Sequence, residues 1–181
     1  MNKYKKIGKD VRVNDLSVIS YPELVSLGSH ISIDQWVYIS TALELGDYIH
    51  IAPSVSIIGG KKALLTMGHF TNIGSGSRIV CSSDDFRKGL ISPVVPIEHR
   101  VLVCSPVVFE DFATLGVNCS VLPGVRLAQG TIVGANSLVT KDTDPWTIYG
   151  GSPARPIGLR DRAQALNSAR QLGYEIDEKL P

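Results

Sequence analysis

Apolar residues recur along this chain at every sixth position, a spacing that fits neither an amphipathic helix, with its period of about 3.6 residues, nor a half-buried alternating strand. The pattern is clearest between Phe109 and Asp142, which reads FEDFAT, LGVNCS, VLPGVR, LAQGTI, VGANSL, VTKD. Four places after each of these apolar residues stands a small or β-branched one: Ala113, Cys119, Val125, Thr131, Ser137 and Thr143. A six-residue period predicts a coil of short parallel strands joined by tight turns, the hexapeptide β-helix.

The same period reaches back almost to the start of the chain. We call the apolar residue that opens each six-residue unit its guide residue. Grouped in threes, the guide residues give six complete turns: 7/13/19, 27/33/39, 45/51/57, 67/73/79, 109/115/121 and 127/133/139. All three interruptions of the period, of two, four and twenty-four extra residues, follow the third member of a group. We therefore expect an all-β solenoid, a triangular prism of about six turns, whose insertions all leave from one corner.

Length and composition are those of one globular unit, with 181 residues, 44% of them hydrophobic and 19% charged. We expect a β-helix domain over 1–158, with a protruding loop over 85–108, and a C-terminal helix and tail over 159–181. The Pro- and Gly-rich run DTDPWTIYGGSPARPIG ends the period. The following LRDRAQALNSARQL has helix-forming composition, and a helix here is expected to close the last turn.

Charge and hydropathy argue against several classes of protein. A net charge of +1 gives no reason to expect binding to nucleic acid. No apolar run is long enough for insertion across a membrane, and MNKYKKIGKD lacks the apolar region of a secretory signal. The three cysteines have no metal-like spacing, and Cys119 occupies an inward repeat position, so a reduced, cytoplasmic location fits.

The repeat resembles the left-handed β-helix hexapeptide acyltransferases. LGVNCSVLPGVRLAQGTIVGANSLVTKD, followed by PWTIYGGSPARPI, resembles the C-terminal signature of their acetyl-CoA-dependent branch, which includes galactoside and maltose O-acetyltransferases. GDYIHIAPSVSIIGG and IVCSSDDF are most similar to the sugar acetyltransferases of surface-polysaccharide gene sets, such as those for lipopolysaccharide. The resemblance implies a left-handed coil, a homotrimer, no metal, and acetyl-CoA bound as a co-substrate in the cleft between adjacent prisms.

The resemblance also implies cofactor contacts at six positions: Gly116, Ala135, Ser137, Thr140, Lys141 and Arg155. The pantetheine arm would pass the first three, because small side chains let a thin chain approach the backbone closely. Lys141 and Arg155 would supply cations for phosphate at the adenosine end, which Thr140 would also meet. The alternative is that the small residues only allow corners to turn and that both cations are solvated surface charges.

Acyl transfer from a thioester needs a general base beside the acceptor and a hydrogen-bond donor for the developing oxyanion. The familiar family base is a histidine early in the long loop, where this chain instead reads SSDDF, with Asp84 and Asp85. His50 matches a histidine of the polysaccharide-linked relatives and is the predicted base, oriented by an aspartate from a neighbouring subunit. His99 is an alternative base, and His50 could instead be a solvated corner residue while the two aspartates cap the loop.

The sequence therefore predicts direct transfer of an acetyl group from acetyl-CoA to a hydroxyl or amino group of a sugar, either nucleotide-linked or a polysaccharide precursor. A covalent route through Cys81 is disfavoured because no histidine is placed beside that thiol. Two alternatives come from other classes. One is a structural or binding β-helix without catalysis, and the other is a γ-type carbonic anhydrase-like zinc enzyme, which would need three converging histidines.

Overall fold

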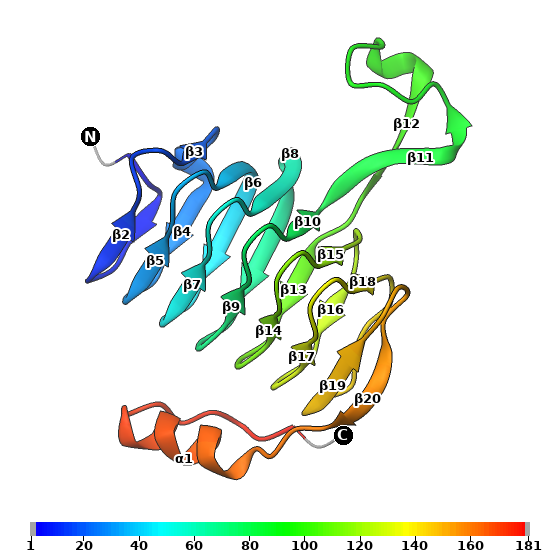
Figure 1. The fold of residues 1–181 in the computed structure, drawn as a ribbon. Coiled ribbons are helices and arrows are strands. Elements are labelled where there is room, and N and C mark those ends of the chain that lie inside the picture. Colours follow the sequence, from blue (N-terminus) through cyan, green and yellow to red (C-terminus); the bar gives the residue numbers. More distant parts are fainter. Residues whose placement is uncertain (1–2, 180–181) are drawn as a thin grey trace.

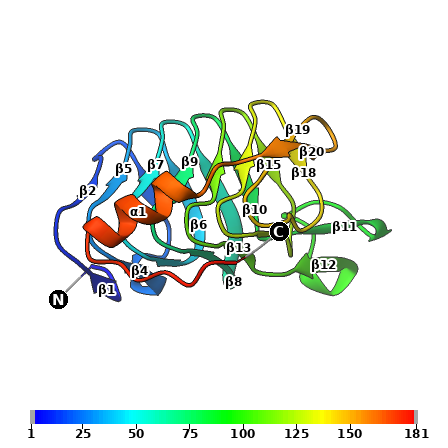
Figure 2. The same ribbon diagram turned by 90° about the horizontal axis from the view of Figure 1, so that it is seen from below.

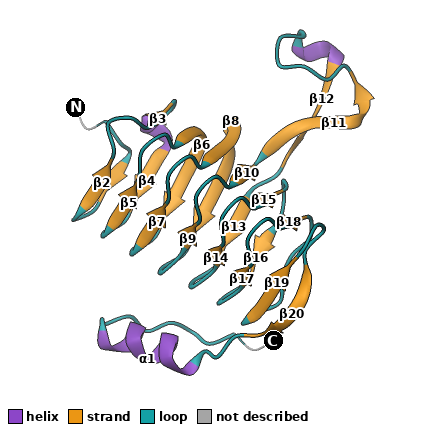
Figure 3. Ribbon diagram, viewed as in Figure 1, coloured by secondary structure: helices purple, strands orange, loops and turns teal. Residues whose placement is uncertain are grey.

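The computed structural model describes residues 3–179, which form a parallel β-helix with one projecting hairpin (Figure 1). Each turn contributes one short strand to each of three walls. Figure 3 shows that strands make up most of the regular structure. The helical segments are two 3-10 turns, η1 (Pro22–Leu24) and η2 (Ile97–His99), and one α-helix, α1 (Ala163–Gln171).

The strands divide among the walls in chain order. The first wall contains β1 (Lys6–Ile7), β4 (Val25–Leu27), the later parts of β6 (Tyr38–Leu45) and β8 (Ser56–Met67), β13 (Val107–Phe109) and β16 (Arg126–Leu127). The second wall contains β2 (Val11–Val13), β5 (Ile31–Ile33), β7 (Ile49–Ile51), β9 (Asn72–Ile73), β14 (Thr114–Leu115), β17 (Ile132–Val133) and β19 (Thr147–Gly150). The third wall contains β3 (Val18–Ile19), the earlier parts of β6 and β8, β10 (Arg78–Val80), β15 (Ser120–Val121) and β18 (Leu138–Val139).

The register of the strands confirms the predicted guide residues. Ile33 pairs with Ile51, and Met67 pairs with Phe109 across the longest insertion. The guide residues from the second turn onward are buried, whereas Ile7 in the first turn is 45% exposed because no earlier turn covers it. A partial seventh turn extends the second wall, since Tyr149 pairs with Val133. The prediction of six turns missed it because residues after 142 lack the six-residue spacing.

The three corners of the prism differ in what they carry. The first corner joins the first wall to the second, the second corner joins the second wall to the third, and the third corner joins the third wall back to the first. All three insertions leave from the third corner, as the sequence predicts: residues 20–24 before β4, residues 59–63 within β8, and residues 81–106 between β10 and β13.

The longest insertion is a β-hairpin rather than a loop. Strands β11 (Ser82–Gly89) and β12 (Arg100–Cys104) run antiparallel, with Ser82 opposite Cys104 and Asp84 opposite Leu102. The hairpin, which we call the arm, projects away from the β-helix (Figure 1). The sequence predicts this protruding segment but not the pairing of its two halves, which satisfies their backbone N–H and C=O groups.

A C-terminal helix is present as predicted, but it does not close the last turn. After β19 the chain folds back as β20 (Arg155–Leu159), antiparallel to β19, and then runs along the β-helix toward its N-terminal turns (Figures 1 and 2). Leu166 and Ala169 of α1 are buried against Phe112 and Trp146 of the first corner. The apolar strip along that corner, rather than the open end, is what the helix covers. Within residues 3–179 no helix has the length and apolar character needed to cross a bilayer.

The strip is part of a column of rings at equivalent positions of the turns, with Gly130 in the turn between Phe112 and Trp146, and His30 at the N-terminal end of the column is exposed. Its members are His30, Tyr48, Phe70, Phe112 and Trp146. Neighbouring ring centroids lie 4.5, 5.1, 5.3 and 5.6 Å apart. All five residues have positive φ, between 51° and 63°, a conformation unfavourable for bulky side chains. Stacking and burial offset that cost.

Candidate functional site

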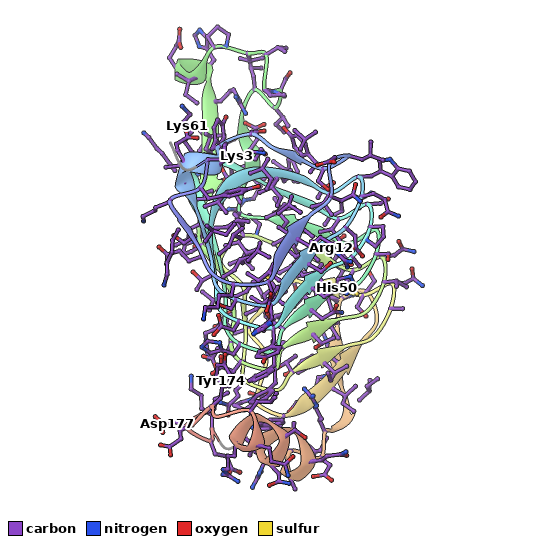
Figure 4. All side chains as sticks on the ribbon, turned by 90° about the vertical axis from the view of Figure 1, so that its left-hand side faces the viewer. Lys3, Arg12, His50, Lys61, Tyr174 and Asp177 are labelled. Atoms are coloured by element: carbon purple, nitrogen blue, oxygen red, sulfur yellow. The ribbon has the colours of Figure 1, made fainter. Side chains whose placement is uncertain are left out.

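The outer face of the second wall carries a ladder of polar side chains over its first four strands. The ladder consists of Arg12, Ser32, His50 and Asn72, which occupy paired positions in successive turns. Figure 4 shows Arg12 and His50 on the same face of the β-helix. An open hollow of about 790 Å³, which we call the second-wall hollow, is lined by this ladder and by His30, Tyr48 and Phe70 of the aromatic column.

His50 is held from both sides of its ring. Nε2 lies 2.8 Å from Oδ2 of Asp34, which follows β5, and Nδ1 lies 3.0 Å from Oδ1 of Asn72 on β9. The side chain remains 47% exposed, so the imidazole is both fixed and accessible from the hollow. A histidine in this setting can accept and return a proton without losing its orientation.

Asp34 is itself oriented by the ladder. Ser32 Oγ donates to Asp34 Oδ1 at 3.0 Å, and Arg12 Nη2 donates to Ser32 Oγ at 2.9 Å. The hydrogen bond from the His50 ring is the main reason that the pKa of Asp34 lies below its usual value; burial opposes this shift, and the Ser32 hydroxyl adds to it. The carboxylate is therefore the stable form, and it offers a separate oxygen to each of its two partners.

Asp84 and Asp85 lie at the base of the arm, and their hydrogen-bond partners are not those of His50. Asp84 accepts from Nε and Nη2 of Arg100, at 2.8 and 3.2 Å, across the hairpin. Asp85 is buried, and Oδ1 accepts from the backbone N–H and Nε of Arg87 at 3.0 and 3.1 Å. The side-chain hydrogen bond from Arg87 is the main cause that lowers the pKa of Asp85. Within the described residues of one chain, neither aspartate forms a hydrogen bond with His50.

The second corner is lined by small residues over its C-terminal turns. Gly74, Ser75, Gly116, Gly134 and Ala135 occupy the first two positions of this corner, whereas the positions equivalent to the rings of the first corner are Gly76, Asn118 and Asn136. A Cβ added at Gly116 would stand 2.8 Å from the backbone nitrogen of Ala135, so position 116 has no room for a side chain. We call this strip of small residues in the C-terminal turns the bare corner; exposed Val117, Asn118 and Asn136 lie beside it.

Ser137, predicted to line the cofactor arm, is buried, and its hydroxyl is used within the fold. Oγ donates to the carbonyl of Gly134 at 2.7 Å and accepts from the backbone N–H of Gly151 at 3.1 Å. Its side chain ties the last turns together. Exposed Ala135, by contrast, faces outward from the bare corner.

The structure brings together three of the predicted cofactor residues. Thr140, Lys141 and Arg155 line one hollow of about 290 Å³ next to β18 and β20, and Asp142 and Tyr149 complete it. Lys141 and Arg155 are both exposed, so two cations face this hollow at the C-terminal end of the β-helix. Phosphate groups are suitable ligands for such a pair.

Two residues of the site, Asp34 and Asn72, were missed by the sequence analysis. The signal was present, because the guide residues already place 32, 50 and 72 side by side on one wall, and Asp34 directly follows guide residue 33. Among residues 3–179, no three His, Cys, Asp or Glu side chains gather as a metal site would require. The zinc-enzyme alternative therefore has no set of ligands in the part of the chain that the structure describes.

A β-helix of six-residue steps with a strip of small residues on one corner is the architecture of the left-handed β-helix hexapeptide acyltransferases, and the chain belongs to this family of enzymes. It is 32% identical to the dTDP-4-amino-4,6-dideoxy-D-glucose acyltransferase of Escherichia coli over 163 aligned residues. The alignment covers 88% of this chain and 84% of that protein. It is also 34% identical over 122 residues to the putative lipopolysaccharide biosynthesis O-acetyl transferase WbbJ of E. coli K12, covering 67% of this chain and 59% of that one. No family model matches the chain.

Among solved structures, the chain resembles AntD, an N-acyltransferase from Bacillus cereus, with a TM-score of 0.90 and 28% identity over 94% of this chain and 91% of AntD. AntD has been solved with dTDP-4-amino-4,6-dideoxyglucose and coenzyme A, and with dTDP and 3-hydroxybutyryl-CoA. Several of these structures carry substitutions at one serine or at one aspartate ten positions further on. These comparisons rule out the alternative of a β-helix without catalysis.

Proposed function

We propose that this enzyme transfers an acetyl group from acetyl-CoA to the amino group of a nucleotide-linked amino sugar. The observation that carries the proposal is the junction of two surfaces: the bare corner runs past Gly116 to Gly74, which lies two residues after Asn72 at the edge of the second-wall hollow. A thioester lying along the corner and a sugar lying in the hollow would therefore meet beside His50. Proximity of this kind supplies a large part of the rate of a two-substrate reaction.

The donor is proposed to lie with its pantetheine arm against Gly116 and Ala135 and its phosphates near Lys141 and Arg155. Thr140 would contact the adenosine end. Ser137 would contribute through the backbone that it anchors, because its hydroxyl is already hydrogen-bonded to Gly134 and Gly151. In this arrangement Gly116 and Ala135 contact the pantetheine arm, and Lys141 and Arg155 pair with the phosphates. Turning the chain at the corner would not by itself require the two cations.

An amine is favoured over a hydroxyl as the acceptor. The E. coli relative that covers most of this chain acts on an amino sugar, and AntD is an N-acyltransferase. WbbJ, an O-acetyl transferase by name, matches a shorter part of the chain. A dTDP-linked 4-amino sugar is therefore the acceptor we expect, and a sugar hydroxyl is the alternative that the experiment below tests.

In the proposed reaction the amine nitrogen attacks the thioester carbonyl carbon, and the C–S bond of the resulting tetrahedral species breaks. His50 accepts the proton that the nitrogen loses, and the departing thiolate takes up a proton. A general base of this kind contributes roughly 10²–10⁴-fold to the rate. No acyl-enzyme is involved, since burial raises the pKa of the Cys81 thiol to about 12.

A homotrimer is proposed because the arm exposes a row of apolar side chains that a lone chain leaves in water. These are Phe86, Leu90, Ile91, Val94 and Ile97. Packing them against a neighbouring β-helix would bury them and would bring the base of the arm toward the neighbour's wall. In this chain a serine with an aspartate ten positions after it occurs once, as Ser75 and Asp85. This spacing matches that of the substituted pair in AntD and favours Asp85, rather than Asp84, as the aspartate that reaches the acceptor.

We place the reaction in the cytoplasm, where acetyl-CoA and nucleotide sugars meet. The three thiols of Cys81, Cys104 and Cys119 are free, as is usual in a reducing compartment.

The test is an acceptor screen with the purified protein and acetyl-CoA, following release of free thiol and the mass of the sugar product. We expect turnover with dTDP-4-amino-4,6-dideoxyglucose and none with the matching 4-hydroxy sugar. Acetylation of the hydroxy sugar at a comparable rate would instead establish an O-acetyltransferase. His50→Ala should lower kcat about 10²–10⁴-fold, whereas His99→Ala, on the exposed arm, should retain activity. The reverse outcome would make His99 the base.

A further inference from the structure

Trp36 occupies a position of the second corner that a bulky side chain disfavours. Its φ is 59°, and the equivalent positions of later turns, which also have positive φ, carry Ser54, Gly76, Asn118 and Asn136. Glycine and asparagine adopt this conformation readily, whereas a bulky residue does so at a cost. The rings of the first corner share the conformation but stack on one another. Trp36 is 63% exposed, and no ring within residues 3–179 stacks on it, so the fold gains little from this indole.

The ring stands at the edge of the surface proposed to hold the acceptor. Trp36 follows Asp34 by two residues, so their Cα atoms lie within about 7 Å of each other. Oδ2 of Asp34 is 2.8 Å from Nε2 of His50. Leu16, at the equivalent position of the preceding turn, is 62% exposed and adds apolar surface beside the indole. A flat, weakly polar group attached to the acceptor sugar would therefore find a platform here.

Arg12 supplies a cation to the same region. Among the described residues that line the second-wall hollow it is the only lysine or arginine, and its side chain is exposed. Nη2 of Arg12 donates to Ser32 Oγ at 2.9 Å, and that hydroxyl donates to Asp34 Oδ1 at 3.0 Å. Within residues 3–179 Arg12 forms no ion pair, whereas Asp10 and Asp34 each pair with a histidine. The guanidinium is thus held on one side and keeps further N–H groups for phosphate oxygens.

We propose, on the basis of the function proposed above, that Trp36 and Arg12 form the nucleotide subsite of the acceptor, where Trp36 stacks on the pyrimidine base and Arg12 pairs with the diphosphate. The sugar then lies beside His50, two strands or about 10 Å from Arg12 along the wall. Every base has a flat π-face that suits an exposed indole, and a guanidinium suits phosphate. The subsite therefore selects nucleotide-linked sugars over free ones.

Tryptophan fluorescence tests the stacking directly on the full chain. The chain has two tryptophans, and Trp146 is 1% exposed, so quenching by an added nucleotide reports mainly on Trp36. We expect dTDP to quench the emission and inorganic pyrophosphate to leave it unchanged. In Trp36→Phe the quenching should disappear, while a calorimetric titration should still detect dTDP binding, because a phenyl ring also stacks.

Two further variants separate the base from the diphosphate. Trp36→Asn should weaken dTDP binding about 10–100-fold and raise the thermal midpoint by about 2–4 °C, because asparagine tolerates positive φ. Arg12→Gln should weaken binding of both dTDP and pyrophosphate at least about tenfold. Arg170→Gln, which removes an exposed cation from α1, is the matched control and should alter neither affinity.

An unaltered dTDP affinity in Trp36→Asn, or an absence of quenching in the wild-type protein, overturns the proposal. A variant that loses dTDP affinity because its subunits separate, as sedimentation velocity would show, also overturns it and assigns the ring to a contact between copies of the chain. If dTDP binds as expected but no amino sugar is acetylated, the subsite stands and the proposed function fails. If the amino sugar is acetylated with the same KM in Trp36→Asn as in the wild-type protein, the function stands and the subsite fails.

Discussion

The first and second corners of this β-helix are built from the same six-residue period, yet they are used in opposite ways. The first corner carries bulky rings at positive φ and is covered by the chain's own C-terminal segment. Over its C-terminal turns the second corner carries glycine, serine and alanine beside exposed Val117, Asn118 and Asn136, and no segment of the chain's C-terminal region covers it. A repeat therefore fixes only the path of the backbone, and the side chain at the corner decides whether another segment of the chain packs against that surface.

Removing a ring from the covered corner should have the largest effect. Trp146 is 1% exposed, and its ring lies in the space that a side chain at residue 130, which is glycine, would fill. Trp146→Ala should lower the free energy of unfolding by about 3–5 kcal/mol, measured by urea denaturation. Trp36→Ala is the matched control, since Trp36 also has positive φ but stands 63% exposed on the second corner. We expect a change within about 0.5 kcal/mol there; equal losses would mean that the two corners are alike.

Filling the bare corner should abolish its use as a groove. Ala135→Trp should weaken binding of acetyl-CoA about 100-fold, or about 2.7 kcal/mol, in a calorimetric titration, while leaving the unfolding midpoint nearly unchanged. Gln35→Trp places the same side chain at the equivalent position of an early turn, outside the proposed donor groove, and should bind acetyl-CoA normally. An unaltered affinity for Ala135→Trp would remove the bare corner from the donor site.

Loosening the cover of the first corner should have a smaller effect. Tyr174 packs edge-on against Tyr48 and Phe70, and its hydroxyl donates to Oδ2 of Asp47 at 2.7 Å. Tyr174→Phe should cost about 1 kcal/mol, seen as faster hydrogen exchange of amides in 172–179. That hydrogen bond is also the main cause that raises the pKa of Tyr174 to about 12. Its contribution is full below the unfolded value of about 10 and should be lost as the pH rises through about 12, in the wild-type protein but not in Tyr174→Phe.

Acid should weaken the far end of the same cover by the smallest amount. Burial alone would raise the pKa of Glu110, but hydrogen bonds from Lys179, Arg126 and the backbone of Gln129 outweigh it and lower the pKa. Glu110 therefore stabilises the docked tail above its unfolded pKa of about 4.3, and this contribution is lost as the pH falls through the lower folded value. We expect a change of less than about 1 kcal/mol. Exchange of the tail amides that is equally acid-sensitive in Glu110→Gln would contradict this assignment.

The sequence predicted the path of the coil almost completely, and the reason is physical. A guide residue contacts its counterpart one turn away, so the period alone sets the pairing of Met67 with Phe109 and of Ile33 with Ile51. The arm was not predicted as a hairpin because its antiparallel pairing depends on contacts that no period records, such as Arg100 with Asp84. The path of α1 was missed because Phe70, Phe112 and Trp146, which share a hydrophobic cluster with it, are far apart in sequence and form a column only once the coil exists.

The site was predicted less completely than the coil. His50, Lys141 and Arg155 stand at accessible positions that agree with their expected uses, which remain predictions. The partner of His50 was expected from another subunit, whereas Asp34 of the same chain already holds it at 2.8 Å. That contact was hidden because sixteen residues separate the two in sequence, although the repeat stacks their turns directly. A comparison of the residues at equivalent positions of successive turns would have found this contact.

The third corner accepts two, four or twenty-four additional residues while the walls on either side keep their register. Lys61, which is labelled in Figure 4, and Lys62 lie at the middle of one such excursion, and both are exposed. A foreign peptide grafted between them would enter β8 where residues 61–63 have no partner on β6, so the paired parts of the walls would keep their register. The third corner is therefore a site at which an epitope or a reporter domain could be inserted. It is separate from the first corner, which the C-terminal segment covers, and from the second corner, where we propose that the donor binds.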